Sequence, residues 1–142
     1  PDLALPGIGI NAAHVPPQKF DPERFTAHYR ELIALFKSAN PHCALLFVTN
    51  NDCLLNLGRR HGKRTNPNTA RVAKAFKELA AETGGAVWDQ YHIMVGSRSS
   101  ALWRGKRLMR PDRIHFTAEG YHLIGDILYN AIITDYLQAD GN

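Results

Sequence analysis

The segment Cys43–Val48 is a continuous run of six apolar residues, and it constrains the fold more than any other part of the sequence. Pro41 precedes this run and the polar residues 49–52 follow it. A strand that is apolar without alternation is typical of a parallel sheet buried on both faces. We expect two further strands, Leu3–Ile10 and Ala86–Trp88, separated by helical patterns. Because parallel strands are joined by right-handed crossovers, this order predicts an α/β domain with helices on both faces of a parallel sheet.

Residues that cap or break helices mark the expected helix boundaries. Residues 11–20 should form a loop, and Asp21-Pro22 should open a helix that ends before Asn40-Pro41. A second helix is predicted between Asn66-Pro67 and Gly84-Gly85, and a short helical turn near Gln90–Met94. Residues 95–113 indicate irregular structure. Thr117 should cap a final helix whose inward side chains are Tyr121, Ile124, Ile127, Leu128, Ala131, Ile132 and Tyr136.

Length and composition limit the class of protein. With 142 residues, 44% hydrophobic and 21% charged, the sequence predicts a single globular α/β domain over residues 1–142. No run of about 18 apolar residues is present, so no membrane-spanning helix is expected. Two cysteines cannot build a disulfide scaffold, and a net charge of +4 is too mild to indicate a nucleic-acid partner by itself.

Polar side chains gather where the predicted strands end, which is where α/β proteins place their active sites. Gly9-Ile10-Asn11 follows the first strand, and Asp112-Arg113-Ile114-His115 immediately precedes the last helix. An Asp three residues before a His can accept a hydrogen bond from the imidazole Nδ1 and leave the other ring nitrogen free as a general base. An Asn side chain can donate to a developing oxyanion. The pattern therefore predicts acyl-transfer chemistry.

These residues resemble the SGNH, or GDSL-type, serine hydrolases. D-x-x-H followed by F-T-x-x-G-Y, from Asp112 to Tyr121, looks like the last block of that family, and Gly9-x-Asn11 looks like its oxyanion block. The resemblance implies a flavodoxin-like three-layer α/β/α fold with a parallel sheet, and an esterase that needs no cofactor. It also implies that His115 is the general base, Asp112 its orienting partner and Asn11 an oxyanion donor.

Two departures from the family pattern matter. Ala12 stands where the family usually has an Asp, which removes a carboxylate that would brace the loop. No G-D-S block is present, so the nucleophilic serine of the family is not in this sequence. Three strands also make a thin sheet against the usual ~5–6. We therefore expect a fold that is incomplete at its N-terminal side, with the missing half disordered, on another chain, or replaced by swapped or oligomeric contacts. This chain alone should be inactive.

Other residues are assigned to substrate binding or to a structural role. Gly9, His14, Asn50, Asn51 and Trp103 are candidates for substrate contact, and for Asn50 and Asn51 capping of their loop is the alternative. For Ser97, Ser99 and Ser100 the sequence favours a flexible loop over a substitute nucleophile, since none follows a strand at a tight turn. No spacing of His, Cys, Asp or Glu indicates a metal site.

Two basic runs leave the partner open. Residues 59–64 and residues 104–113 are rich in Lys and Arg, and either a solvated surface or attraction to an anionic glycan, cell-wall polymer or lipid headgroup explains them. The preferred function is ester hydrolysis, with deacetylation of a carbohydrate or cell-wall polymer as the substrate class, and the family resemblance favours a periplasmic or secreted location. The alternatives are an acyltransferase and a non-catalytic module that binds an anionic polymer.

Overall fold

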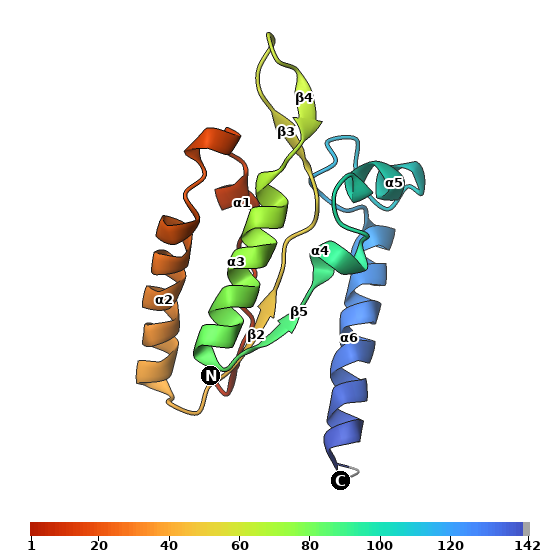
Figure 1. The fold of residues 1–142 in the computed structure, drawn as a ribbon. Helices are drawn as coiled ribbons and strands as arrows, with labels where there is room; N and C mark the ends of the chain where they lie inside the picture. The colour runs from red at the N-terminus through yellow and green to blue at the C-terminus, as the bar shows by residue number, and fades with distance from the viewer. Residues whose placement is uncertain (141–142) are drawn as a thin grey trace. The chain divides into compact units, whose positions relative to one another are not determined.

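The computed structural model describes residues 1–140. These form two compact units, residues 1–99 and residues 100–140, each of which is described by itself below. The elements follow the chain in this order (Figure 1): β1 Leu3–Ala4, α1 Ile10–Ala13, the 3-10 helix η1 Pro17–Lys19, α2 Pro22–Ala39, β2 Ala44–Val48, β3 Leu54–Asn56, β4 Lys63–Thr65, α3 Asn68–Thr83, β5 Ala86–Trp88, α4 Gln90–Ile93, α5 Ser99–Gly105 and α6 Ala118–Asp140.

The first unit is built on a three-stranded parallel sheet in the order β1-β2-β5. Leu3 lies opposite Ala44 in β2, and Phe47 of β2 lies opposite Val87 in β5. The prediction of a mixed α/β fold with a parallel sheet is confirmed. The strand predicted at Cys43–Val48 is the central one, as its continuous apolar character requires.

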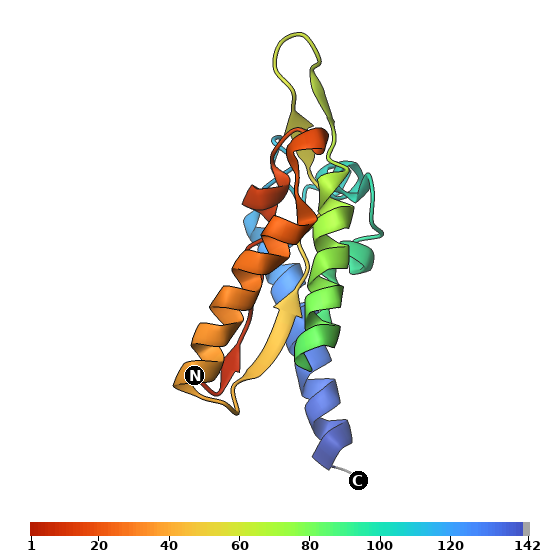
Figure 2. The ribbon, with the colours of Figure 1, turned by 60° about the vertical axis from the view of Figure 1, so that its left-hand side comes forward.

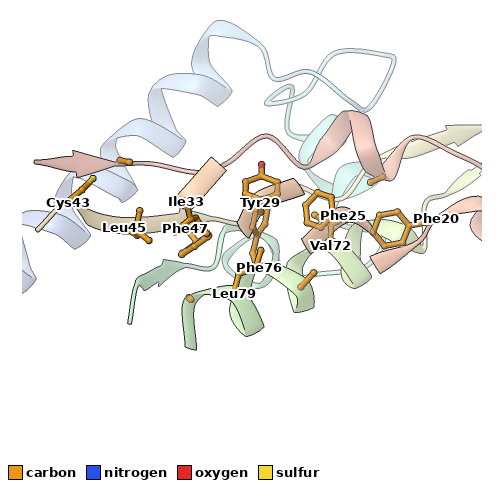
Figure 3. Packing of buried hydrophobic residues seen from close by; sticks show 14 residues of the cluster. Phe20, Phe25, Tyr29, Ile33, Cys43, Leu45, Phe47, Val72, Phe76 and Leu79 are labelled. Atoms are coloured by element: carbon orange, nitrogen blue, oxygen red, sulfur yellow. The ribbon is translucent and has the colours of Figure 1, made fainter. Parts of the chain in front are cut away.

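Helices α2 and α3 run side by side and bury one face of this sheet (Figures 1 and 2). Tyr29 of α2 and Phe76 of α3 meet edge to face with ring centroids 4.9 Å apart. Phe47 of β2 lies against the same phenylalanine, with its ring centroid 6.1 Å from that of Phe76 (Figure 3). Aromatic pairs in such geometry contribute ~0.5–1.5 kcal/mol beyond the burial of their area.

The helix boundaries in this unit follow the capping signals. Asp21 Oδ1 accepts hydrogen bonds from the backbone N–H groups of Glu23 and Arg24, at 3.0 and 3.1 Å, and Pro22 is the first residue of α2. Gly84 ends α3 in the left-handed conformation, at φ 67°. Both predicted helices are therefore confirmed.

The predicted strand Leu3–Ile10 was wrong in its length, since β1 contains only Leu3 and Ala4. Pro6 still accepts a hydrogen bond from the Val48 N–H, at 2.9 Å, so the backbone continues beside β2. Proline has no N–H to return, and the ladder therefore stops there. The predicted loop 11–20 was also wrong in part, because Ile10–Ala13 and Pro17–Lys19 form short helices.

Between β2 and α3 the first unit contains a β-hairpin that the sequence did not predict. Strands β3 and β4 pair antiparallel, with Leu55 opposite Arg64, and the connecting turn projects beyond the end of α3 (Figures 1 and 2). Gly58 and Gly62 flank the turn at positive φ, a conformation that glycine adopts without strain. We call residues 54–65 the basic finger.

The second unit contains the rest of α5, a loop and α6. Residues 95–113 were predicted to be irregular, and this was wrong for α5, where Trp103 lies over Phe116 with ring centroids 5.7 Å apart. Thr117 caps α6 as predicted, its Oγ1 accepting from the Gly120 N–H at 3.1 Å.

The inward face predicted for the last helix was wrong for Tyr121, Ile132 and Tyr136, which are 55%, 40% and 62% exposed. The reason is that α6 carries apolar residues on more than one side, so a single periodic face is not defined. None of the helices in the described part of the chain combines the length and the apolar character needed to cross a bilayer.

Candidate active site

The D-x-x-H segment folds into a turn in which the Asp holds the His. Asp112 Oδ2 lies 2.9 Å from Nδ1 of His115. The other carboxylate oxygen, Oδ1, accepts the backbone N–H groups of Ile114 and His115 at 2.8 and 3.0 Å. When the ring proton is on Nδ1, the imidazole donates to the carboxylate and Nε2 is left as a base. The structure thus brings together the two residues predicted as base and orienting partner.

These hydrogen bonds change the acidity of Asp112. Its partial burial acts to raise the pKa of the carboxyl, but the hydrogen bonds from the His115 ring and from the two backbone N–H groups outweigh burial and lower the pKa to about 2. Asp112 is therefore a carboxylate at neutral pH. A fixed negative charge beside Nδ1 stabilises an imidazolium formed by proton uptake at Nε2.

A short antiparallel contact closes the loop that carries this pair. Met109 and Phe116, both buried, form an isolated β-bridge, and Arg110 donates its N–H to the His115 carbonyl at 2.8 Å. Thr117 donates its N–H to the Leu108 carbonyl at 3.0 Å. The two ends of the loop are therefore hydrogen-bonded to each other, which fixes the backbone on both sides of the Asp112–His115 pair.

Gly120 is required where α6 passes this loop. A Cβ at this position would lie 2.9 Å from the Leu108 carbonyl carbon and nearer still to its oxygen, both of them backbone atoms. The glycine of the F-T-x-x-G-Y block thus has a steric role. Trp103, predicted to contact substrate, is half-buried in the same unit, where its ring packs on Phe116.

In the first unit, Gly9 and Asn11 lie where the chain turns from β1 into α1. A Cβ on Gly9 would lie 2.6 Å from Val72 Cγ1 and 3.0 Å from Phe76 Cε2, so only glycine lets this segment approach α3. The Tyr29 hydroxyl donates to the Ile8 carbonyl at 2.9 Å. Asn11 is exposed on the first turn of α1 and His14 is half-buried at its end.

Two buried asparagines, not identified in the sequence, fix the backbone that follows Asn11. Asn66 donates through Nδ2 to the Ala13 carbonyl at 2.9 Å. Asn68 donates to the carbonyls of Ala13 and Val15 at 3.1 and 2.9 Å. The sequence feature that could have identified them is the pair of asparagines at the predicted helix start. It does not name their partners, because the carbonyls that they bind lie more than 50 residues away in the sequence. These residues position the loop that carries Asn11.

The segment after β2 is buried. Asn50 and Asn51 are 5% and 8% exposed, and each donates its side-chain amide to the backbone carbonyl of the next residue. Asn50 Oδ1 lies against Gly9 and has no hydrogen-bond partner among the described residues. The structure therefore places Gly9 and Asn50 together, on the inner side of the loop that presents Asn11.

A second D-x-x-H pair follows β5. Asp89 Oδ2 lies 2.7 Å from Nδ1 of His92, and the same oxygen forms an ion pair with Lys77. Burial acts to raise the pKa of Asp89, and the hydrogen bonds from Lys77, His92 and Thr49 outweigh it and lower that pKa. Because Lys77 already neutralises this carboxylate, Asp89 supports an imidazolium at His92 less than Asp112 does at His115. Within residues 1–140, no Lys or Arg forms an ion pair with Asp112.

The serines near residue 100 do not form the predicted flexible loop. Ser99 and Ser100 are fully buried at the start of α5, and Arg113 donates to Ser100 Oγ at 2.9 Å. Only Ser97 is exposed. The prediction of a flexible loop was wrong for Ser99 and Ser100 because they begin a buried helix, and burial keeps their hydroxyls from substrate.

A cavity of about 440 Å³ opens in the first unit beside the loop that follows Asn11. Its walls are apolar and cationic, and they are formed by Ala12, Val15, Lys19, Phe20, Asp21, Arg24, Phe25 and His28. Its volume lies within the ~300–1,000 Å³ range of small-molecule sites. In the described part of the chain, no three His, Cys, Asp or Glu side chains gather as a metal site would require.

Comparison with known proteins places these observations in a family. A family model described as "GDSL-like Lipase/Acylhydrolase family" matches residues 1–123. No curated protein matches the chain.

Two solved structures share the fold. One is a peptidoglycan O-acetylesterase, with a TM-score of 0.75 and 19% sequence identity, aligned over 94% of this chain and 38% of its own. The other is the lipase/acylhydrolase from Enterococcus faecalis, with a TM-score of 0.65 and 20% identity, aligned over 93% of this chain and 61% of its own. The chain thus spans less than two thirds of the length of either neighbour.

Proposed function

The chain belongs to the GDSL-like lipase/acylhydrolase family, and from this premise we propose that it carries the general base and an oxyanion donor of a serine ester hydrolase. The observation that supports this most is the Asp112–His115 pair, with Nδ1 held at 2.9 Å from the carboxylate. Such a pair is what an Asp-oriented general base requires.

In the proposed reaction, His115 Nε2 accepts the hydroxyl proton of a serine as the serine oxygen attacks the ester carbonyl carbon. The carbonyl oxygen becomes an oxyanion, and His115 then returns the proton to the departing alcohol oxygen as the C–O bond breaks. Water repeats the sequence on the acyl-enzyme and releases the carboxylic acid. Asp112 stays ionised throughout, because its pKa of about 2 lies far below that of an imidazole.

Asn11 is the proposed oxyanion donor. Its side chain is exposed, while the backbone around it is held from three sides: by Tyr29 at Ile8, by the close packing of Gly9 on α3, and by Asn66 and Asn68 after it. A preorganised donor of this kind lowers the barrier by ~3 kcal/mol in other enzymes, because it needs no rearrangement during the reaction. The rigid backbone supports this role even though Ala12 supplies no bracing carboxylate.

The sequence contains no G-D-S block, so the reaction requires a serine that these 142 residues do not carry. We propose that another segment or chain supplies it, and that the 142-residue chain alone does not hydrolyse esters. For the substrate, we propose an acyl ester on a carbohydrate. The structural similarity to a peptidoglycan O-acetylesterase supports this choice over a free lipid ester.

The test uses the natural protein, purified with its partners through a tag at the carboxyl end of this sequence. We expect it to release acetate from p-nitrophenyl acetate, and His115→Ala to lower kcat at least ~100-fold, in the range typical of lost general-base catalysis. His92→Ala is the matched control, since it removes the His of the same D-x-x-H spacing and should leave kcat unchanged.

Two results would contradict the proposal. The first is equal loss of activity in the two variants, which would show that neither histidine acts as the specific base. The second is ester hydrolysis by the isolated 142-residue chain that His115→Ala abolishes, which would show that the nucleophile lies within this sequence.

A further inference from the structure

The basic finger carries a concentration of positive charge that the rest of the protein does not neutralise. Between Cys53 and Lys77 the sequence contains six Lys and Arg residues and no Asp or Glu. Four of the cations, Arg59, Arg60, Lys63 and Arg64, lie on the finger and are exposed. Within residues 1–140 none of these four forms an ion pair with an acidic side chain. Like charges held together without counter-ions attract a polyanion.

The base of the finger is fixed to the loop beside the cavity. Asn66 and Asn68, which directly follow β4, bind the carbonyls of Ala13 and Val15. Arg71, one turn into α3, donates to the Pro17 carbonyl at 2.9 Å, and its guanidinium lies 5.0 Å from the ring centre of Phe20. The finger and the cavity therefore belong to one rigid part of the first unit.

The cavity carries the second group of cations. Lys19 and Arg24 line it, together with His28 and the apolar side chains of Phe20 and Phe25. Asp21 also lines it and caps α2 through Oδ1, and its one negative charge leaves the lining net positive against Lys19 and Arg24. A site with a cationic rim and aromatic walls suits a sugar ring that bears a negative charge, because the ring packs on the apolar surface while its charge faces the cations.

A polymer fits two separate cationic sites better than a small anion does. Nucleic acid is disfavoured as that polymer, because residues 53–75 contain no Phe, Tyr or Trp on which bases could stack. A membrane surface is disfavoured because no large apolar side chain is exposed on the finger. An acidic polysaccharide carries the required negative charge and needs neither aromatic stacking nor an exposed apolar side chain on the finger.

We propose that the basic finger and the cavity together bind an acidic polysaccharide, the finger holding the chain and the cavity holding one sugar unit. The choice of a polysaccharide rests on the proposed function, because an esterase needs a polymer that carries acyl esters. The cationic surface itself does not depend on catalysis.

The test is the binding of polygalacturonate, which carries carboxylates but no ester, to the 142-residue chain at increasing salt. We expect binding that weakens steeply with salt, as charge-driven association does. Arg59→Gln/Arg60→Gln and Lys19→Gln/Arg24→Gln should each lower affinity by ~tenfold or more, and Arg59→Lys/Arg60→Lys should stay within ~threefold of the wild type because the charges remain.

The matched control is Lys74→Gln/Arg98→Gln, which removes two exposed cations elsewhere in the first unit. Its net charge falls from +4 to +2, as it does in the finger and cavity variants. Equal loss in the control and the finger variant would overturn the proposal, because binding would then follow net charge alone. Tighter binding of random duplex DNA, or of vesicles of phosphatidylcholine with phosphatidylglycerol, would also overturn it. Since no ester is cleaved, loss of p-nitrophenyl acetate hydrolysis in the natural protein would count against the proposed function and not against this surface.

Discussion

Gly120→Ala tests whether α6 holds the D-x-x-H loop through close backbone contact. The new Cβ would lie 2.9 Å from the Leu108 carbonyl carbon and nearer to its oxygen. Ordinary C···O contacts are ~3.3–3.6 Å, so this carbonyl must move by on the order of 1 Å. Such a movement disrupts the 3.0 Å hydrogen bond from the Thr117 N–H.

The expected magnitude follows from three effects. Overpacking costs about 1–3 kcal/mol, and a lost hydrogen bond costs about 0.5–1.5 kcal/mol. Alanine in place of glycine within a helix gains about 1 kcal/mol. The net result is a destabilisation of about 1–3 kcal/mol. Gly125→Ala is the control on the same helix, where an added Cβ meets nothing within 4 Å, and it should stabilise by up to about 1 kcal/mol.

The assay is urea unfolding, combined with hydrogen exchange at the Thr117 and Arg110 amides, which close the loop around His115. Gly120→Ala should speed exchange at both amides and lower the unfolding free energy, while Gly125→Ala should do neither. Shifts of the same sign and size in the two variants would refute the reasoning, because the effect would then be helix propensity and not the contact with Leu108.

Three further predictions concern charges and buried polar groups. The stabilisation that Asp112 gains from its lowered pKa should be complete above pH 3.8 and disappear as the pH falls to about 2. Because 41% of the side chain is exposed, this stabilisation amounts to less than about 1 kcal/mol. Urea unfolding of the wild type and of Asp112→Asn across this pH range measures it. Asn68→Ala should destabilise by about 1–3 kcal/mol in the same assay, because the Val15 carbonyl loses its side-chain donor and the Ala13 carbonyl keeps only the one from Asn66. Arg30→Ala, which removes the exposed ion pair with Glu82, should lower the unfolding free energy only slightly, and less as salt is added.

The sequence predicted well wherever the deciding interaction is local. Asp21 and Pro22 start α2 because an N-cap acts on the next three residues, and Gly84 ends α3 because the left-handed conformation is decided at one position. The D-x-x-H turn belongs to the same class, since Asp112 reaches His115 across three residues. The ends of α2 and α3 and the geometry of the Asp112–His115 pair could therefore be derived from neighbours along the chain.

The failures arise where the partner is distant in the sequence. Asn50 and Asn51 were assigned either to substrate contact or to capping of their loop, and nothing in their pattern says that the fold buries them. Asn68 binds carbonyls more than 50 residues away. The basic finger was missed because three short cross-strand pairs give too little periodicity to distinguish a hairpin from a charged loop.

The two D-x-x-H pairs show why spacing alone does not define a catalytic base. Both bring a carboxylate within 2.9 Å of a His Nδ1, because a turn with i, i+3 spacing puts the two side chains within reach of each other. Both carboxylates also accept backbone N–H groups, from His92 at Asp89 and from Ile114 and His115 at Asp112, and they differ in that Lys77 forms an ion pair with Asp89. The backbone bonds hold the charge of Asp112 in place without cancelling it, whereas the lysine cancels that of Asp89. The chemistry of the motif therefore depends on the residues around it, and these favour His115 over His92 as the proposed general base.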